Sequence, residues 1–244
     1  MKSVWIIYLV IIVYYILGTA GIYFINRNKD EATRRRAWIK HFTYFFLISL
    51  IYFSIAINVT LFRYVAIIII IAGILELTKL YVQSGYRHLL FYVASLIILA
   101  LLSTAFYSFT GMEQGLILFA FLILCIFDGF SQVTGQLLGK RKLLPRISPN
   151  KTVEGLIGGA TVSVLSSLVF RNIIPADPGQ ALLIASVVVL FAFGGDTAKS
   201  VFKRKYNVKD FSRIIPGHGG FLDRFDSLIA GGAGVALLSW FTGF

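Results

Sequence analysis

The stretch LLFYVASLIILALLSTAFYSF, residues 89–109, contains no charged side chain. A continuous apolar run of about 20 residues can cross the hydrocarbon core of a bilayer as an α-helix, whereas a membrane β-strand needs only about 10 residues of alternating character. Within hydrocarbon a segment must satisfy its own backbone hydrogen bonds, as a helix does. This stretch therefore predicts a membrane-spanning helix.

Similar runs recur along the whole chain. Of its 244 residues, 57% are hydrophobic and only 14% are charged, whereas soluble domains are about 25% charged. The first run is also longer than a signal-peptide core of about 7–15 residues. We expect an all-α, polytopic membrane protein of about eight transmembrane helices, forming one integral membrane domain over residues 1–244. The apolar runs lie at residues 4–25, 42–61, 64–81, 89–109, 115–139, 153–174, 180–195 and 221–244.

The basic residues follow an alternating pattern across these runs. Twenty of the 23 Lys and Arg residues lie in four loops, at residues 26–41, 79–88, 139–152 and 199–224. Because cytoplasmic loops are enriched in Lys and Arg, this asymmetry places the four loops in the cytoplasm and both termini outside. Topology thereby accounts for the net charge of +12. We expect a membrane partner and no nucleic acid.

Two spans carry ionisable residues at membrane depth, where such residues are functional candidates. Glu76 and Lys79 are spaced to share a helix face and to pair near the end of the third run. In the fifth run, Asp128 begins a stripe of polar and small residues at three- and four-residue steps, which must face protein or a wet cavity. The other members of the stripe are Ser131, Gln132, Gly135, Gln136 and Gly139.

The most polar segment is GDTAKSVFKRKYNVKDFSRIIPGHGGFLDRFDS, residues 195–227. On a helix, Asp196, Ser200 and Lys203 share one face, and so do Asp223 and Asp226. Carboxylates suit a hard divalent ion, bases suit polyphosphate, and glycines let backbone N–H groups approach phosphate. The segment therefore predicts a magnesium–nucleotide site. The simpler interpretation is a set of interfacial ion pairs, such as Asp223 with Arg224 or Lys203.

A second polar loop, GKRKLLPRISPNKTVEG, covers residues 139–155. Ser148 followed by Pro149 is typical of a helix N-cap with proline at the first helical position. A helix that begins there would present its N-terminus beside Lys151 and Thr152 as an anion site.

Residues 200–226 resemble the signature of the CTP:phosphatidate cytidylyltransferase family, and SPNKTVEG (148–155) resembles that family's SP-x-KT-x-EG element. The resemblance covers residues 115–244, the catalytic half; residues 1–110 are less diagnostic. The matching positions are Ser200, Lys203, Arg204, Lys209, Asp210, Ser212, Pro216, His218, Gly219, Gly220, Asp223, Arg224 and Asp226.

The resemblance implies transfer of a cytidylyl group from CTP to phosphatidate, giving CDP-diacylglycerol and pyrophosphate, in a bacterial plasma membrane and as a possible homodimer. It implies Mg²⁺ held by Asp196, Asp223 and Asp226, with Lys203 and Arg204 also catalytic. The expected substrate-binding residues are Ser148, Lys151, Thr152, Glu154, Ser200, Lys209, His218, Gly219, Gly220, Arg224 and Asp128.

Two alternatives remain at this point. The first is a CTP-dependent enzyme acting on another lipid, such as a polyprenol kinase or an ether-lipid cytidylyltransferase. The second is a transporter that uses Asp128 and Glu76, although the outer halves of the spans are almost wholly apolar.

Overall fold

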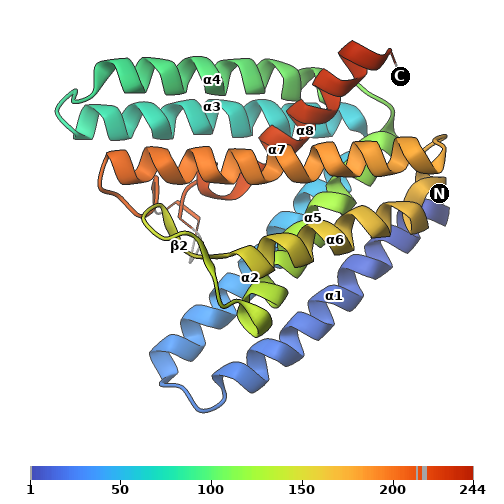
Figure 1. Ribbon diagram of the computed structural model, residues 1–244, viewed down its shortest axis with the longest axis horizontal. Helices are drawn as coiled ribbons and strands as arrows, with labels where there is room; N and C mark the ends of the chain where they lie inside the picture. The colour runs from blue at the N-terminus through green and yellow to red at the C-terminus, as the bar shows by residue number, and fades with distance from the viewer. Residues whose placement is uncertain (1, 213, 216–218, 244) are drawn as a thin grey trace.

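The computed structural model describes residues 2–212, 214–215 and 219–243 (Figure 1). Within these residues, eight helices are long and apolar enough to cross a membrane, as the sequence predicts. The elements in chain order are α1 (Lys2–Asn26), α2 (Glu31–Ile57), α3 (Val59–Gln83), α4 (Leu89–Phe109), α5 (Gln114–Leu138), β1 (Lys142–Leu144), β2 (Ser148–Thr152), α6 (Val153–Phe170), the 3₁₀ turn η1 (Arg171–Ile173), α7 (Pro178–Lys205) and α8 (Leu222–Thr242).

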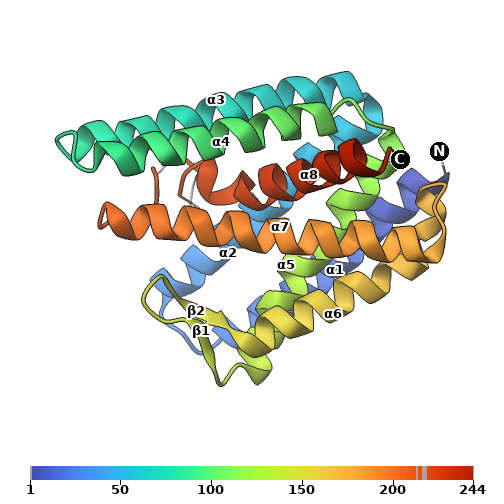
Figure 2. The same cartoon turned by 45° about the horizontal axis from the view of Figure 1, so that its top comes forward.

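Helix α8 lies at the centre of the bundle. It packs against α7, α4, α5 and α3. Of the most apolar stretch of α8, 61% is buried inside the protein, compared with 13% for α1. Its buried residues include Gly232 and Gly234, whose lack of a side chain admits the aromatic rings of Phe106, Phe109 and Phe191. In Figure 2, α3 and α4 form one layer at the top, α7 and α8 lie beneath them, and α5 and α6 lie below α7.

The connections between helices fall into two groups, one at each end of the bundle. Figure 1 shows both termini at one end, whereas the α1–α2, α3–α4, α5–α6 and α7–α8 connections lie toward the other end. These four connections correspond to the four basic loops of the sequence. The structure therefore brings the two polar loops, at residues 139–155 and 195–227, to the same end of the molecule.

Two local predictions were wrong. The seventh helix ends not near residue 195 but at Lys205, although the predicted placement of Asp196, Ser200 and Lys203 on one helix is confirmed. Ser148 is not a helix cap, because residues 148–152 form strand β2 and pair with β1 in antiparallel register. Helix α6 begins after Thr152 instead, whose Oγ1 accepts a hydrogen bond of 3.1 Å from the Gly155 backbone N–H.

Helices α5 and α6 cross closely because the polar stripe of α5 includes small residues. A Cβ atom built on Gly159 of α6 would lie 1.9 Å from Ser131 Oγ and 2.9 Å from the Phe127 carbonyl oxygen. Gly135 likewise faces Gly155. Part of the predicted stripe is therefore a packing surface, while Asp128 is exposed.

Replacing Gly159 by leucine is expected to separate α5 from α6. Since the Phe127 carbonyl is backbone and cannot rotate away, we expect a loss of about 1–3 kcal/mol of unfolding free energy, measured by denaturant unfolding in detergent. Gly129→Leu is the matched control, because a Cβ at that α5 position meets nothing within 4 Å. Equal stability of the two variants would contradict the close crossing.

Candidate active site

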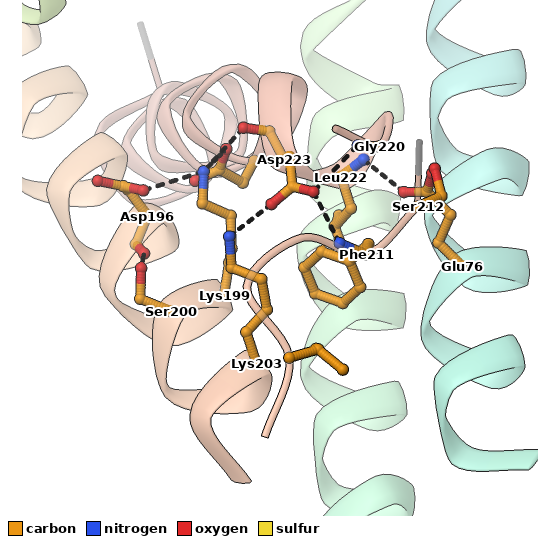
Figure 3. A network of polar contacts seen from close by, with 12 residues as sticks. Glu76, Asp196, Lys199, Ser200, Lys203, Phe211, Ser212, Gly220, Leu222 and Asp223 are labelled. Atoms are coloured by element: carbon orange, nitrogen blue, oxygen red, sulfur yellow. Dashed lines mark hydrogen bonds and ion pairs between the residues drawn. The ribbon is translucent and has the colours of Figure 1, made fainter. Parts of the chain in front are cut away.

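The predicted acids gather where α7 and α8 meet at the loop-bearing end of the bundle (Figure 3). Lys199, one turn beyond Asp196 on α7, links the two helices. Its Nζ lies 3.0 Å from Asp196 Oδ1 and 2.7 Å from Asp226 Oδ1 on α8, and it donates a 2.9 Å hydrogen bond to the Asp223 carbonyl oxygen. One ammonium group therefore holds two carboxylates together.

Strand β2 adds a second ammonium group to this cluster. Lys151 Nζ lies 2.6 Å from Asp196 Oδ2 and donates to Thr197 Oγ1 at 3.3 Å. The aromatic ring of Phe193 lies 4.8 Å from the same nitrogen. The Asp196 side chain remains 32% exposed. The β-hairpin thus contributes Lys151 directly to the acid cluster on α7.

Asp223, in the first turn of α8, is almost completely enclosed. Its Oδ1 pairs with Lys203 Nζ at 2.5 Å, and its Oδ2 accepts hydrogen bonds from the backbone N–H groups of Phe211 (2.8 Å) and Gly220 (3.0 Å). These contacts fold the α7–α8 loop back onto the start of α8 (Figure 3). Both carboxylate oxygens are occupied by protein donors, so this residue holds the loop in place, and its expected role as a metal ligand stays a prediction.

Glu76, on α3, lies on the other side of the same loop. Its carboxylate is buried and accepts hydrogen bonds from Ser212 Oγ (2.6 Å), Phe221 N–H (3.0 Å) and Leu222 N–H (2.9 Å). Among the described residues, no ion pair joins Glu76 to Lys79, which is exposed. The predicted Glu76–Lys79 pair was therefore wrong, because loop donors take the carboxylate instead.

Several predicted binding residues have structural partners. Ser200 Oγ donates to the carbonyl oxygen of Asp196 in its own helix. Arg204 Nε donates to the Ile147 carbonyl oxygen at 2.9 Å and so ties α7 to the hairpin. Glu154 accepts from the backbone N–H groups of Lys140 and Arg141, each at 3.1 Å, and closes the other end of the hairpin.

Other predicted residues lie around this network. Lys209 and Arg224 are exposed, and Ser148 is half-buried in β2. Gly219 adopts a φ of +88°, a conformation that glycine tolerates readily. Asp128 lies on α5, a helix that packs against both α7 and α8. Pro216 and His218 lie outside the described residues.

Asp196 and Asp226 fit a divalent cation. Asp226 is 7% exposed, and its Oδ2 is buried without a hydrogen-bond partner, a costly arrangement that a cation would relieve. The Lys199 ammonium already occupies a position between the two acids. No cluster of three or more acidic, His or Cys side chains suited to a metal is found among the described residues, but Mg²⁺ commonly takes one or two carboxylates and completes its shell with phosphate and water.

Comparison with known proteins agrees with this arrangement. The model of the family described as "Cytidylyltransferase family" matches residues 1–242. The chain belongs to the cytidylyltransferase family. The match includes α1–α4, so Glu76 lies within the family's domain as much as the acids of α7 and α8 do.

Curated relatives bear one name. Proteins named phosphatidate cytidylyltransferase from Staphylococcus epidermidis and Staphylococcus saprophyticus are 47% and 46% identical over 127 residues, which is 50% of this chain and 49% of each relative. The protein of that name from Staphylococcus aureus is 45% identical over 115 residues, covering 46% of this chain and 44% of the relative. The aligned segments therefore span about half the length of the curated relatives.

Two residues of this candidate site, Lys199 and Glu76, were not selected as site residues from the sequence. Lys199 lies three positions after Asp196, so the helical spacing that selected Ser200 and Lys203 also contained it. Glu76 carried a signal, being ionisable at membrane depth. Its partners lie 136 to 146 residues away along the chain, and no local pattern identifies them.

Proposed function

We propose that this protein transfers a cytidylyl group from CTP to phosphatidate, forming CDP-diacylglycerol and pyrophosphate for phospholipid synthesis. The proposal rests on the Asp196–Lys199–Asp226 cluster. Two carboxylates from different helices flank the Lys199 ammonium group, and Asp226 Oδ2 is buried without a hydrogen-bond partner. The family membership and the name of the relatives support the same reaction.

The nucleophile of this reaction needs little activation. A phosphatidate phosphate oxygen is already anionic, so it attacks the α-phosphorus of CTP directly. The new P–O bond forms while the bond to the bridging oxygen of the β-phosphate breaks, and that oxygen leaves with pyrophosphate. Positioning and charge neutralisation are therefore the main demands on the protein.

The described residues can meet these demands. Asp196 and Asp226 would hold Mg²⁺, which neutralises triphosphate charge and favours departure of pyrophosphate. Lys151 and Lys199, now paired with these acids, are placed to turn toward phosphate oxygens. Asp223 and Lys203 keep the α7–α8 loop folded back onto the start of α8. Asp128 lines the same region from α5.

The location of the site suits a lipid substrate. It lies at one end of a bundle of membrane helices, where acyl chains can stay in the bilayer while the headgroup meets a soluble nucleotide. The concentration of Lys and Arg in the loops of this end supports a cytoplasmic orientation in the plasma membrane. The family resemblance also implies a homodimer, which cross-linking in native membranes would test.

The reaction is tested by following two radioactive labels of CTP in purified protein with Mg²⁺ and phosphatidate. We expect α-phosphorus label to enter the lipid fraction and γ-phosphorus label to leave as pyrophosphate, with both changes abolished by EDTA. Transfer of the γ label to a polyprenol, with release of CDP, would instead identify a lipid kinase. Absence of turnover with every lipid offered would exclude a cytidylyltransferase reaction.

A further inference from the structure

We infer that Glu76 is a positioning residue that locks the α7–α8 loop in its folded conformation and so couples α3 to the active site. This inference rests on the proposed function for its catalytic consequence, but its structural part stands on contacts alone. Glu76 is 4% exposed. Its three hydrogen-bond donors all come from the loop or from the first turn of α8.

The three contacts lie before and after Gly219 and Gly220 in the chain. Ser212 belongs to the loop that follows α7, whereas Phe221 and Leu222 begin α8. The backbone N–H groups at a helix start lack partners within the helix, and a negative charge near them is favourable. The Glu76 carboxylate therefore caps α8 from another helix and at the same time holds Ser212.

Gly220 shows how closely the carboxylate fits. A Cβ atom built at this position would lie 2.4 Å from Glu76 Oε1 and 2.5 Å from Oε2. Glu76 cannot easily yield, because each of its oxygens is bound to backbone N–H of α8. A glycine is thus required at position 220 so that α3 can place its acid against the loop.

Glu76 and Asp223 act on the loop from two sides. Asp223 binds the N–H groups of Phe211 and Gly220, while Glu76 binds the neighbouring residues Ser212 and Phe221. Losing Glu76 would release the side of the loop that faces α3, and the Lys203–Asp223 pair would then hold a less ordered segment. Catalysis would fall although Glu76 touches no substrate.

Hydrogen–deuterium exchange in nanodiscs tests the structural part directly. In Glu76→Ala, the amides of Phe211 and Gly220, which bond to Asp223 and not to Glu76, are expected to lose protection by roughly ten- to a hundred-fold. Glu76→Gln should give a smaller loss, because an amide keeps one acceptor oxygen but turns an N–H group toward a backbone donor. Ser212→Ala should add little further loss in the Glu76→Ala background.

Two controls separate this role from general stability. Lys79→Ala removes an exposed charge one turn away on α3, and Glu113→Gln makes the same chemical change at the N-cap of α5, which has no side-chain capping bond. Both should leave loop exchange unchanged. Exchange in α5 and α6 should also stay unchanged in the Glu76 variants.

Measuring cytidylyl transfer together with loop exchange distinguishes a failure of the positioning role from a failure of the proposed reaction. In Glu76→Gln we expect kcat/KM for CTP to fall by about ten-fold, with loss of loop protection in the same variant. Unchanged loop protection in Glu76→Ala and Glu76→Gln would overturn the positioning role, whatever the activity. A wild-type protein without cytidylyl transfer but with loop protection that depends on Glu76 would overturn the reaction and keep the positioning role.

Discussion

Asp226→Asn is expected to lower cytidylyl transfer by about a thousand-fold, because losing several kcal/mol of charge stabilisation in the transition state has an effect of that size. The replacement keeps the shape of the side chain and an oxygen that can accept from Lys199. It removes the negative charge from the buried position where Oδ2 has no partner. The measurement is Mg²⁺-dependent formation of labelled lipid from CTP and phosphatidate at saturating substrate.

Asp177→Asn provides the matched control for this charge change. Asp177 caps α7 at the opposite end of that helix by accepting from Gly179 and Gln180 N–H, and asparagine caps a helix about as well as aspartate. We expect near wild-type turnover in the control. Similar turnover in Asp226→Asn would remove Asp226 from the metal site and leave Asp196 without its partner acid.

Lys203→Met is expected to destabilise the protein by about 3–5 kcal/mol, the usual cost of removing one partner from a buried ion pair. The Lys203 and Asp223 side chains are 12% and 3% exposed, so water cannot replace the lost ammonium group. Methionine keeps an unbranched side chain of similar length, but it lacks the ammonium group, which lies 5.8 Å from the centre of the Phe211 ring. Denaturant unfolding in detergent micelles measures the change, and cytidylyl transfer should fall with it as the loop opens.

Lys205→Met is the control for this variant, since Lys205 is exposed two residues further along α7 and should change the unfolding free energy by at most about 0.5 kcal/mol. Adding Asp223→Asn to Lys203→Met should recover part of the lost stability, because the unpaired buried charge is then gone. A Lys203→Met protein as stable as Lys205→Met would show that the pair is not buried in the working protein.

The sequence predicted the membrane bundle well because the physics of spanning a bilayer is local. Each apolar run must be long enough to cross and must form a helix. The count of eight spans and the grouping of the basic loops at one end follow from length and charge alone. The errors concern the loop-bearing end, where segments such as residues 148–152 and 196–205 extend into polar surroundings and no length rule applies.

For the candidate site, too, the sequence predicted some features and the structure was needed for others. Helical spacing and the resemblance of residues 148–155 and 200–226 to a family signature selected Asp196, Lys203, Asp223 and Asp226 from the sequence. The sequence also named Lys203 as a candidate partner of Asp223, and the structure confirms that pair. That Lys199 joins Asp196 to Asp226 depends on how α7 crosses α8, which no local pattern shows.

The sequence by itself determined that this chain is a bundle of membrane helices with its polar chemistry gathered in two loops at one end, because hydrophobic length and charge asymmetry act residue by residue. Only the tertiary structure decided how the acids pair: Asp196 and Asp226 share Lys199, whereas Asp223 and Glu76 bind the α7–α8 loop. Burial and hydrogen bonding depend on neighbours far apart in the chain. Glu76 and Gly220, 144 positions apart, form a contact that only packing of α3 beside α8 creates.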